Sequence, residues 1–355
     1  MIGAAPQKYE AEAAAAADII PPHRTGMEGR LHLSLLHDGA RTIIAGQRAE
    51  PPLAVQRALY CEQSLPDMAY VYVTSTSGGI LQGDRHVTRF DLGGGARAHI
   101  TTQGATRIYG TRDSARTEKK PAARASLRMS LGESSYLEYM PDQIIPYAGS
   151  RFRQDAVISV HETATLVYAE TVSPGRVGMG ESFAYESCSL RMRVTDQDER
   201  FRFVDAARME PRIVSLQPSA SSASSASSAS PRTASLSSSS QTSTPKQTSH
   251  LQSQSANKST LDIKSFGIME KYDVVSSLYV ITEKKYVEVL QKGIDDIILR
   301  HSEIAGGATV MSGNTGVMAR LLGRDTESVG SATTEAAAYA RKIVLGAPFT
   351  DVRKS

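Results

Sequence analysis

The sequence has no tryptophan, few aromatic residues and very little cysteine. Its 355 residues contain 2 cysteines, and aromatic residues make up 6% of the chain. Cys61 and Cys188 are far apart and belong to no CxxC pair, so neither a disulfide framework nor a structural zinc site is indicated. A reducing compartment suits such a chain, and we therefore expect a cytoplasmic protein.

Long apolar runs and a strong excess of one charge are also missing. No stretch approaches the roughly 20 apolar residues that a membrane-spanning helix needs. The formal net charge is +3, and Arg232, Lys246 and Lys258 supply as many positive charges within a serine-rich tract that has no acid. A nucleic-acid binder concentrates lysine and arginine on one face. The near-neutral remainder therefore predicts that neither nucleic acid nor a membrane is a partner.

Composition divides the chain into three kinds of segment. Residues 1–26 are alanine-rich without apolar periodicity, and we expect a flexible leader there. Residues 217–260 are mostly Ser, Ala, Thr and Gln, which cannot bury enough apolar surface to offset the entropy of ordering, so they are predicted to be a disordered insert. Residues 27–216 and 261–355 are predicted to form a single β-rich domain, because the strand pattern resumes after the insert.

The periodicity before the insert is that of strands, and the period changes after it. Apolar residues alternate with polar ones in four runs between glycine-rich turns, around residues 31–35, 71–73, 127–131 and 190–194. After a further strand at 277–282, five apolar residues follow a helical stripe between 287 and 298, and a second helix is predicted between 327 and 345, ended by Pro348. The expected fold is mostly β, a wound or layered architecture of many strands, with a few α-helices mainly near the C-terminus.

A glycine-rich segment between residues 77 and 84 has two interpretations. Gly78, Gly79 and Gly83 are spaced like the start of a phosphate-binding loop, but that loop needs Lys and then Ser or Thr after its last glycine. Asp84 stands there instead, and its carboxylate would repel phosphate, so we reject nucleotide binding. The alternative is a tight turn in which Asp84 accepts hydrogen bonds from backbone N–H groups.

The segment from residue 137 to residue 144 places an acid inside a strand-like run. Glu138 has bulky neighbours and lies either on a solvent-facing side or at an internal polar site, and both interpretations stay open. Pro141 ends the strand or places it at the edge of a sheet, and Asp142 follows directly.

The segment from residue 170 to residue 181 combines glycines, a proline and an arginine between two acids. Gly175 and Gly180 suit turns. The plain interpretation of Arg176 is an ion pair with a glutamate. The functional alternative is that Glu170 and Glu181 supply oxygen ligands, or a polar passage, for a hard or borderline cation.

Motifs of common enzymes and of closed metal sites are missing from the sequence. The eight histidines form neither HxH nor HExxH, and there is no GxSxG. A stable transition-metal site is therefore not expected, although catalytic carboxylates need no motif. A β-rich carbohydrate-processing enzyme that uses Glu170 and Glu181 as paired acids stays as the alternative, and the lack of tryptophan for stacking on sugars counts against it.

Taken in order, these segments resemble the urease accessory protein D family, also called UreD or UreH. The resemblance covers nearly the whole chain outside the leader and the insert, with six pieces in the family's order and approximate spacing. The pieces are Gly29–Leu31, Ser77–Asp84, Thr101–Thr106 with Tyr109, Leu137–Ile144, Gly175–Glu181 and Arg320–Gly323. Within them, the residues of the structural motif are Gly78, Gly79, Gly83, Thr102, Pro141, Gly175, Arg176 and Gly180.

The resemblance implies a fold, a function and partners. Members of the family have a mostly β, helix-like winding of strands with a few helices. They are similar to scaffolds rather than enzymes, and they bind apo-urease on one side and the accessory proteins F and G on the other. Nickel released by the GTPase G would reach the buried urease centre through an internal passage lined by polar and acidic groups. The resemblance implies no tightly bound cofactor, only transient Ni²⁺.

Such a passage has to release nickel as well as bind it. Scattered carboxylates and carbonyls suit this task better than a cluster of histidine and cysteine. The candidates for a transient nickel passage are Asp84, Glu138, Asp142, Glu170 and Glu181. A third possibility is a pure interaction protein without a metal role, in which these acids would be dispensable.

Overall fold

The computed structural model describes residues 26–111, 121–213, 261–262 and 269–349. The predicted insert at 217–260 and all but the last residue of the predicted leader at 1–26 lie outside the described residues. The chain divides into two compact units, and residues 212–262 form the smaller one. The described part of this unit is a two-stranded pair, β15 (Arg212–Ile213) and β16 (Leu261–Asp262).

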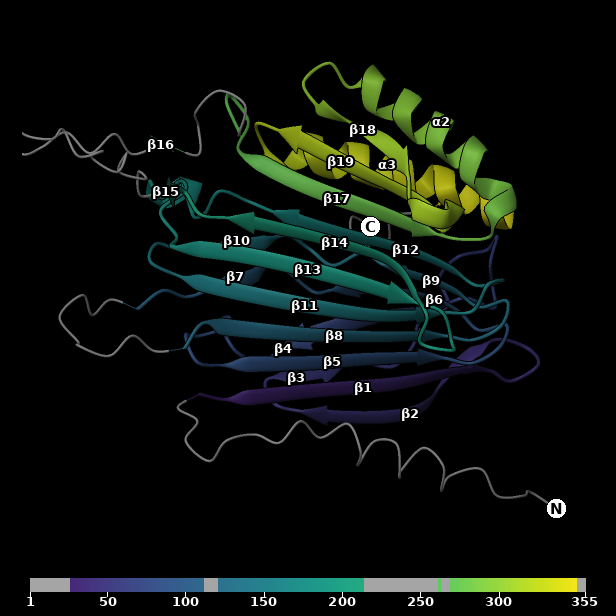
Figure 1. Cartoon of the computed structure of the whole chain (residues 1–355). Helices are drawn as coiled ribbons and strands as arrows, with labels where there is room; N and C mark the ends of the chain where they lie inside the picture. Colours follow the sequence, from purple (N-terminus) through teal and green to yellow (C-terminus); the bar gives the residue numbers. More distant parts are fainter. Residues whose placement is uncertain (1–25, 112–120, 214–260, 263–268, 350–355) are drawn as a thin grey trace, which may run out of the picture. The chain divides into compact units, whose positions relative to one another are not determined.

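The larger unit contains two many-stranded sheets, which confirms the prediction of a mostly β, layered fold (Figure 1). We name them sheet A and sheet B. Sheet A has seven strands in the order β14 (Phe201–Met209), β13 (Ser187–Thr195), β11 (Arg151–Val160), β8 (Ala123–Leu131), β5 (Arg85–Leu92), β1 (Glu28–His37) and β2 (Thr42–Glu50).

Sheet B has ten strands. Eight of them follow the order β18 (Ala305–Val310), β19 (Gly316–Gly323), β17 (Val274–Ile281), β12 (Thr165–Val172), β9 (Tyr136–Tyr139), β6 (Arg97–Thr102), β4 (Ala69–Ser75) and β3 (Leu53–Val55). The other two are short: β10 (Ile144–Pro146) pairs with β12 and with β7 (Thr106–Ile108).

The middle of the chain winds between the two sheets. From β4 onward the longer strands alternate between sheet B and sheet A, and each pairs in parallel with the strand of the turn before it. Antiparallel strands then extend the winding at its ends, as in the β1–β2, β13–β14 and β12–β17–β19 pairs. The wound, β-helix-like arrangement predicted from the sequence is thus the arrangement of these central strands.

Alternation along the strands decides which side chains form the core. Side chains of successive strand residues point to opposite faces, so each predicted apolar run presents one row to the interior. Leu33, Val71, Met129 and Met192 from the four predicted runs are buried in one cluster between the sheets. A second, smaller cluster around Phe152 also lies between the sheets, at one end of them.

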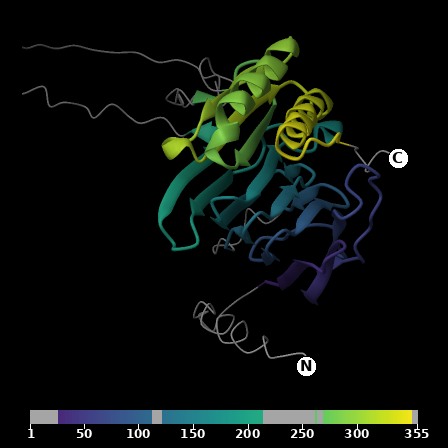
Figure 2. The same ribbon diagram turned by 90° about the vertical axis from the view of Figure 1, so that its right-hand side faces the viewer.

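Two α-helices cover the other face of sheet B (Figures 1 and 2). Helix α2 (Lys284–Arg300) buries the stripe predicted from the sequence: Val287, Leu290, Ile294, Ile297 and Ile298. Helix α3 (Thr326–Leu345) packs small residues, mainly alanines, onto the sheet. The two helices meet at Gly293, where a β-carbon would come within 2.2 Å of the Tyr339 ring, so only glycine allows this close approach.

The end of α3 differs from the prediction. Pro348 was expected to end the helix, but the last helical residue is Leu345. Gly346 follows with φ of +67° and donates its N–H to the carbonyl of Lys342 at 3.0 Å. A left-handed glycine closes a helix by satisfying its last carbonyl groups, so termination occurs before the proline is reached.

Candidate functional site

Two groups of buried polar residues lie on opposite faces of sheet B, and each contains one glutamate singled out in the sequence. The strands β9 and β12 are parallel neighbours that pair Glu138 with Val167 and Tyr139 with Tyr168. Glu138 points to the helices, whereas Glu170, two residues beyond Tyr168, points to sheet A. Both glutamates are buried, at 0% and 6% exposure.

The Glu170 group interrupts the apolar core between the sheets. In β12, Glu170 stands between Val172 of the smaller apolar cluster and Tyr168 of the larger one. Gln154 occupies the matching position in β11 and reaches Glu170 from sheet A. A polar layer therefore crosses the sandwich between two apolar clusters, and it is built from both sheets.

The carboxyl group of Glu170 has neutral hydrogen-bond donors and, within the described residues, no ion pair. The hydroxyl of Tyr168 and Nε2 of Gln154 both donate to Oε1, the latter at 2.5 Å. Burial raises the pKa of Glu170 to about 7 because desolvation outweighs the two hydrogen bonds, which act in the opposite direction. Near neutral pH this carboxyl is therefore poised between its charged and neutral forms.

A second acid lies close to Glu170 and links the two sheets. Asp205 in β14 accepts hydrogen bonds from the hydroxyl of Tyr279 at 2.6 Å and from Nη2 of Arg320 at 2.5 Å. Glu170, Ser277 and Arg320 stand opposite one another on three adjacent strands. Among the described residues, Arg320 Nε is buried without a hydrogen-bond partner. Asp205 was not predicted, because a single acid in an alternating strand looks the same in sequence whether it faces water or the core.

The Glu138 group is built around an arginine of α3. Arg341 is 0% exposed, and its Nε donates to Oε1 of Glu138 at 2.7 Å while Nη2 donates to Oε2. His99 Nδ1 lies 2.7 Å from Oε2, and the hydroxyl of Tyr136 donates to Oε1 at 2.8 Å. The internal interpretation of Glu138 is thus the one that the structure shows.

Arg341 also holds a second acid, so the network joins three parts of the chain. Its Nη1 donates to Glu62, in the segment before β4, and to the hydroxyl of Tyr70 at 3.1 Å. The ring of Phe349 covers the guanidinium at 4.3 Å. Burial alone would raise the pKa of Glu138, but the hydrogen bonds from Arg341 and His99 and the charge of Arg341 lower it to about 2. Sequence reasoning missed Arg341 because it lies in an otherwise ordinary amphipathic helix.

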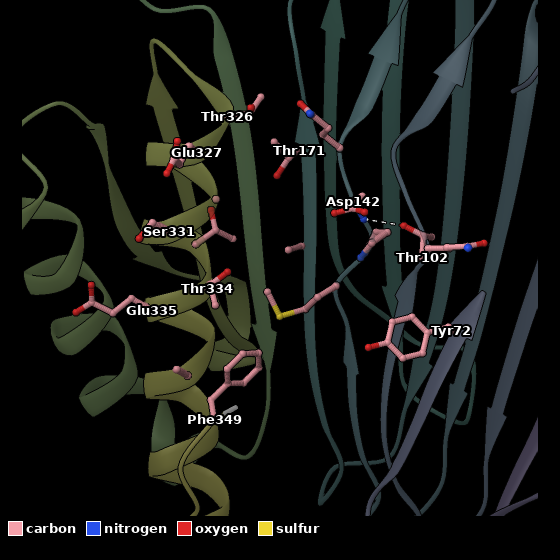
Figure 3. Close-up of a pocket in the computed structure, with 18 residues that line it drawn as sticks. Tyr72, Thr102, Asp142, Thr171, Thr326, Glu327, Ser331, Thr334, Glu335 and Phe349 are labelled. Atoms are coloured by element: carbon pink, nitrogen blue, oxygen red, sulfur yellow. Dashed lines mark hydrogen bonds between the residues drawn. The ribbon is translucent and has the colours of Figure 1, made fainter. Parts of the chain in front are cut away.

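A groove of about 970 Å³ lies between α3 and the end of β9 (Figure 3). Thr102, Pro141 and Asp142 line it, and the backbone N–H of Asp142 donates to Oγ1 of Thr102 at 2.9 Å. Glu327 of α3 lines it from the other side. Three residues from two sequence motifs therefore meet in one groove, on the face of sheet B opposite to Glu170.

Asp84 lies in the turn that the sequence predicted. One carboxylate oxygen accepts the backbone N–H of Met27 at 2.8 Å, and the other accepts that of Leu81 at 3.0 Å. Gly79 and Gly83 have φ of +156° and +99°, and at Gly79 a β-carbon would come within 2.4 Å of the Arg107 carbonyl oxygen. The glycines and Asp84 therefore shape a turn.

Glu181 and Arg176 form the ion pair that the plain interpretation predicted. Nε of Arg176 donates to Oε2 of Glu181 at 2.9 Å, and Arg176 lies over the ring of Tyr147 at 4.3 Å. The hydrogen bond from Arg176 lowers the pKa of Glu181. Gly175 and Gly180 have positive φ and turn the loop that carries the pair. Glu181 thus belongs to this loop, whereas Glu170 belongs to β12, and neither lines the groove.

The described residues contain no group of three or more His, Cys, Asp or Glu side chains placed to hold a metal ion. Both cysteines are free: Cys188 is buried in the smaller apolar cluster and Cys61 is exposed. In the part of the chain that the structure describes, no helix has the length and apolar character to span a bilayer. The described part of the chain is therefore a wound β protein whose buried acids lie in separate groups on the two faces of sheet B.

Comparison with known proteins identifies the family to which this wound β protein is similar. The model of the UreD urease accessory protein family matches residues 27–230 and 222–354. The urease accessory protein UreD of Cenarchaeum symbiosum (strain A) is 35% identical over 331 residues, 93% of this chain and 97% of that protein. UreD 2 of Brucella abortus (strain 2308) is 28% identical over 334 residues, which are 94% and 93% of the two chains. UreD of Photorhabdus laumondii is 38% identical over 193 residues, which are 54% and 58%.

The chain belongs to the UreD urease accessory protein family. Membership supports a role in urease maturation and, by the family's description as an accessory protein, a non-catalytic one. It also implies interaction with urease.

Proposed function

We propose that this chain is a non-catalytic scaffold that binds apo-urease and the accessory proteins F and G and assists nickel insertion into the urease active site. The scaffold acts in the cytoplasm, where its two free cysteines, Cys61 and Cys188, remain reduced. Nickel is its cargo. The ion passes through the protein by way of acidic side chains that come from separate segments of the chain.

The observation that supports this proposal most is the Glu170 group. A buried carboxyl with a pKa near 7 and only neutral hydrogen-bond donors can take up a cation and release a proton, and it can reverse the exchange. One carboxylate with hydroxyl and amide oxygens nearby is a weak site for a borderline metal ion. Weak binding is what a site of passage requires, because the ion has to leave again.

The other four candidate acids differ in how far their oxygens are already used. Glu138 is bound by Arg341, His99 and Tyr136, and Asp84 accepts two backbone N–H groups. Glu181 is paired with Arg176. Asp142 lines the groove beside α3. We therefore rank Glu170 above Asp84, Glu138 and Glu181 as a nickel-passing residue. Asp142 is placed second because it lines the groove.

The positions of Glu170 and Glu181 do not support the alternative of a carbohydrate-processing enzyme. It requires two carboxyl groups that face each other across one cleft, roughly 5 to 10 Å apart. Glu170 lies between the sheets, Glu181 lies in a loop paired with Arg176, and the groove is lined by neither of them. The observations favour the scaffold.

The test is the nickel content of urease that is co-expressed with its accessory set in the presence of wild-type chain, of Glu170→Gln or of no chain. The glutamine keeps the shape of the side chain and still accepts from Tyr168, but it cannot ionise. Glu162→Gln, in an exposed turn, is the matched control. We expect nickel per urease site to fall several-fold with Glu170→Gln while co-purification of urease stays unchanged.

Three results would count against the proposal in different ways. Unchanged nickel content without any chain would remove the maturation role. Full loading with Glu170→Gln would remove Glu170 from the passage, and loss of urease binding by the same variant would give Glu170 a structural role instead.

A further inference from the structure

The outer face of sheet A carries many arginines, although the small net charge of the chain does not indicate a basic surface. Inward positions of these strands hold the apolar residues between the sheets, so the alternate positions face outward. Within the described strands of sheet A, outward positions hold arginine eleven times and lysine never: Arg30, Arg48, Arg85, Arg89, Arg124, Arg128, Arg151, Arg153, Arg191, Arg193 and Arg208. We call these residues the arginine face, and Figure 1 shows its strands side by side.

The strand register places several of these arginines directly opposite one another. Arg85, Arg124 and Arg153 stand in one row across β5, β8 and β11. Arg89 and Arg128 face each other in another row. Like charges in directly opposed positions of a sheet are destabilising, so this arrangement costs stability that folding alone does not require.

Carboxylates compensate for only part of the arginine face. Six of its eleven arginines form an ion pair, two of them with Glu186 and Glu210 just outside the strands: Arg30, Arg48, Arg89, Arg151, Arg153 and Arg208. The outward positions of the same strands hold four acids: Glu28, Glu50, Asp91 and Asp155. In the described residues no ion pair involves Arg124, Arg128, Arg191 or Arg193, and all four are exposed. Strands β8 and β13 therefore present exposed guanidinium groups that form no ion pair within the described residues.

The composition of the arginine face points to an acidic protein surface rather than to nucleic acid. Asp91 and Asp155 lie among the arginines, where they would repel a continuous phosphate backbone. The outward positions of β5, β8, β11 and β13 hold no aromatic side chain on which a base could stack. Val157 and Val204, 38% and 43% exposed, flank Arg193 in one row and add the apolar contact typical of protein interfaces.

We propose that the arginine face is a docking surface for an acidic surface of a partner protein. Arginine suits this role because its planar guanidinium makes paired hydrogen bonds to a carboxylate, which the ammonium group of lysine cannot do. Five lysines occur in the described residues, and all of them belong to the segment from 271 to 342, away from sheet A: Lys271, Lys284, Lys285, Lys292 and Lys342. The choice of urease apoprotein as this partner rests on the function proposed above.

The experiment is co-purification of urease apoprotein with the full-length chain from cells that express both. The test variant carries Arg124→Glu, Arg128→Glu and Arg193→Glu. These three arginines form no ion pair in the described part of the chain, so their replacement leaves no carboxylate there without its partner. The matched control carries Lys271→Glu, Lys284→Glu and Lys342→Glu, which change the net charge equally on the part of the chain that carries the helices. Circular dichroism melting shows whether each variant is folded.

We expect the arginine variant to retain at least tenfold less urease than wild type, and the lysine variant to retain as much as wild type. Raising the salt concentration from about 0.05 to 0.3 M should weaken the wild-type and control complexes, because exposed charges are screened over a shorter distance. A folded arginine variant that retains urease like wild type overturns the docking surface and leaves the scaffold proposal standing.

Two further outcomes would overturn the proposal. A wild-type chain that retains no urease removes urease as the occupant and contradicts the scaffold function as well. A 20-nucleotide RNA that binds wild type and the lysine variant, but not the arginine variant, assigns the face to nucleic acid if urease binding is the same in all three proteins.

Discussion

Glu138 and Glu170 are buried in neighbouring strands of the same sheet, yet the pKa of one falls to about 2 and that of the other rises to about 7. Desolvation is the largest cause at both sites and raises the pKa in each case. The guanidinium of Arg341 outweighs it at Glu138, whereas Glu170 has only the neutral donors Tyr168 and Gln154 in direct contact. The partner, rather than the depth of burial, thus decides the charge.

The two faces of sheet B therefore differ in what they can do. On the helix side, Arg341 favours the charged form of Glu138, also binds Glu62, and joins α3 to the sheet. On the sandwich side, Glu170 can change its charge near neutral pH without losing a fixed partner. The buried ion pair of Arg341 with Glu138 stabilises the packing of α3 on sheet B. The carboxyl of Glu170, which can gain or lose a proton near neutral pH, can exchange that proton for a cation.

Removal of Arg341 is the change with the largest expected effect on this comparison. Arg341→Met keeps most of the side-chain volume but removes the cation that both buried carboxylates, of Glu62 and Glu138, contact. Breaking a buried ion pair from one side costs about 3 to 5 kcal/mol, and we expect a loss of unfolding free energy in this range by urea denaturation.

Arg300→Met in α2 is the control for Arg341→Met. Arg300 pairs with Glu335 on the surface, where its side chain is 62% exposed, and such pairs contribute below about 1 kcal/mol. Equal losses for the two variants would mean that burial does not distinguish the two ion pairs.

The pH dependence of stability should have opposite signs for Glu138→Gln and Glu170→Gln. Relative to the ordinary value of 4.5, the pKa of Glu138 is lowered, so its contribution is present above pH 4.5 and is lost as the pH falls toward 2. The pKa of Glu170 is raised, so its contribution is present below pH 4.5 and is lost as the pH rises toward 7. The shifts correspond to about 3 kcal/mol for each group.

Melting temperatures measured from pH 3 to pH 8 test this pair of variants. Glu138→Gln should be most destabilising at neutral pH and approach wild type in acid. Glu170→Gln should resemble wild type near pH 4.5 and be more stable at pH 8. Parallel profiles for the two variants would show that their surroundings do not separate the two carboxyl groups.

The sequence predicted the layers of this fold because burial of strands and helices leaves a period. Alternating runs such as Leu31–Leu35 identified strands, and the stripe from Val287 to Ile298 identified α2. Many short strands between turns predicted a layered or wound architecture. The helix-like winding of the central strands came from the family resemblance, since pairing between distant strands leaves no local pattern. The end of α3 was misplaced because a left-handed glycine, Gly346, acts before Pro348.

The candidate sites were predicted less completely than the fold. Glu138 and Glu170 stood out as acids within apolar runs, but Arg341 and Asp205 are brought to them only by packing of distant elements. The near-neutral net charge gives no sign of a basic surface, yet the strand register shows arginines gathered on one face. The prediction that nucleic acid is no partner rested on that balance, and it remains a prediction that the RNA arm of the docking experiment tests.

The smallest expected change in unfolding free energy is that of Arg124→Ser. This variant tests an exposed charge, where the variants above test buried ones. Arg124 lies directly between Arg85 and Arg153 across three adjacent strands, with no ion pair among the described residues. Arg124→Ser removes repulsion that water already screens, so the unfolding free energy should stay equal or rise by about 0.5 kcal/mol. Urea denaturation at low salt measures it, with Arg153→Ser, which also breaks the ion pair with Asp155, as the contrast. A clear loss of stability in Arg124→Ser would mean that this arginine stabilises the fold. It would contradict the inference that the arginines of sheet A destabilise the fold and are present for a partner.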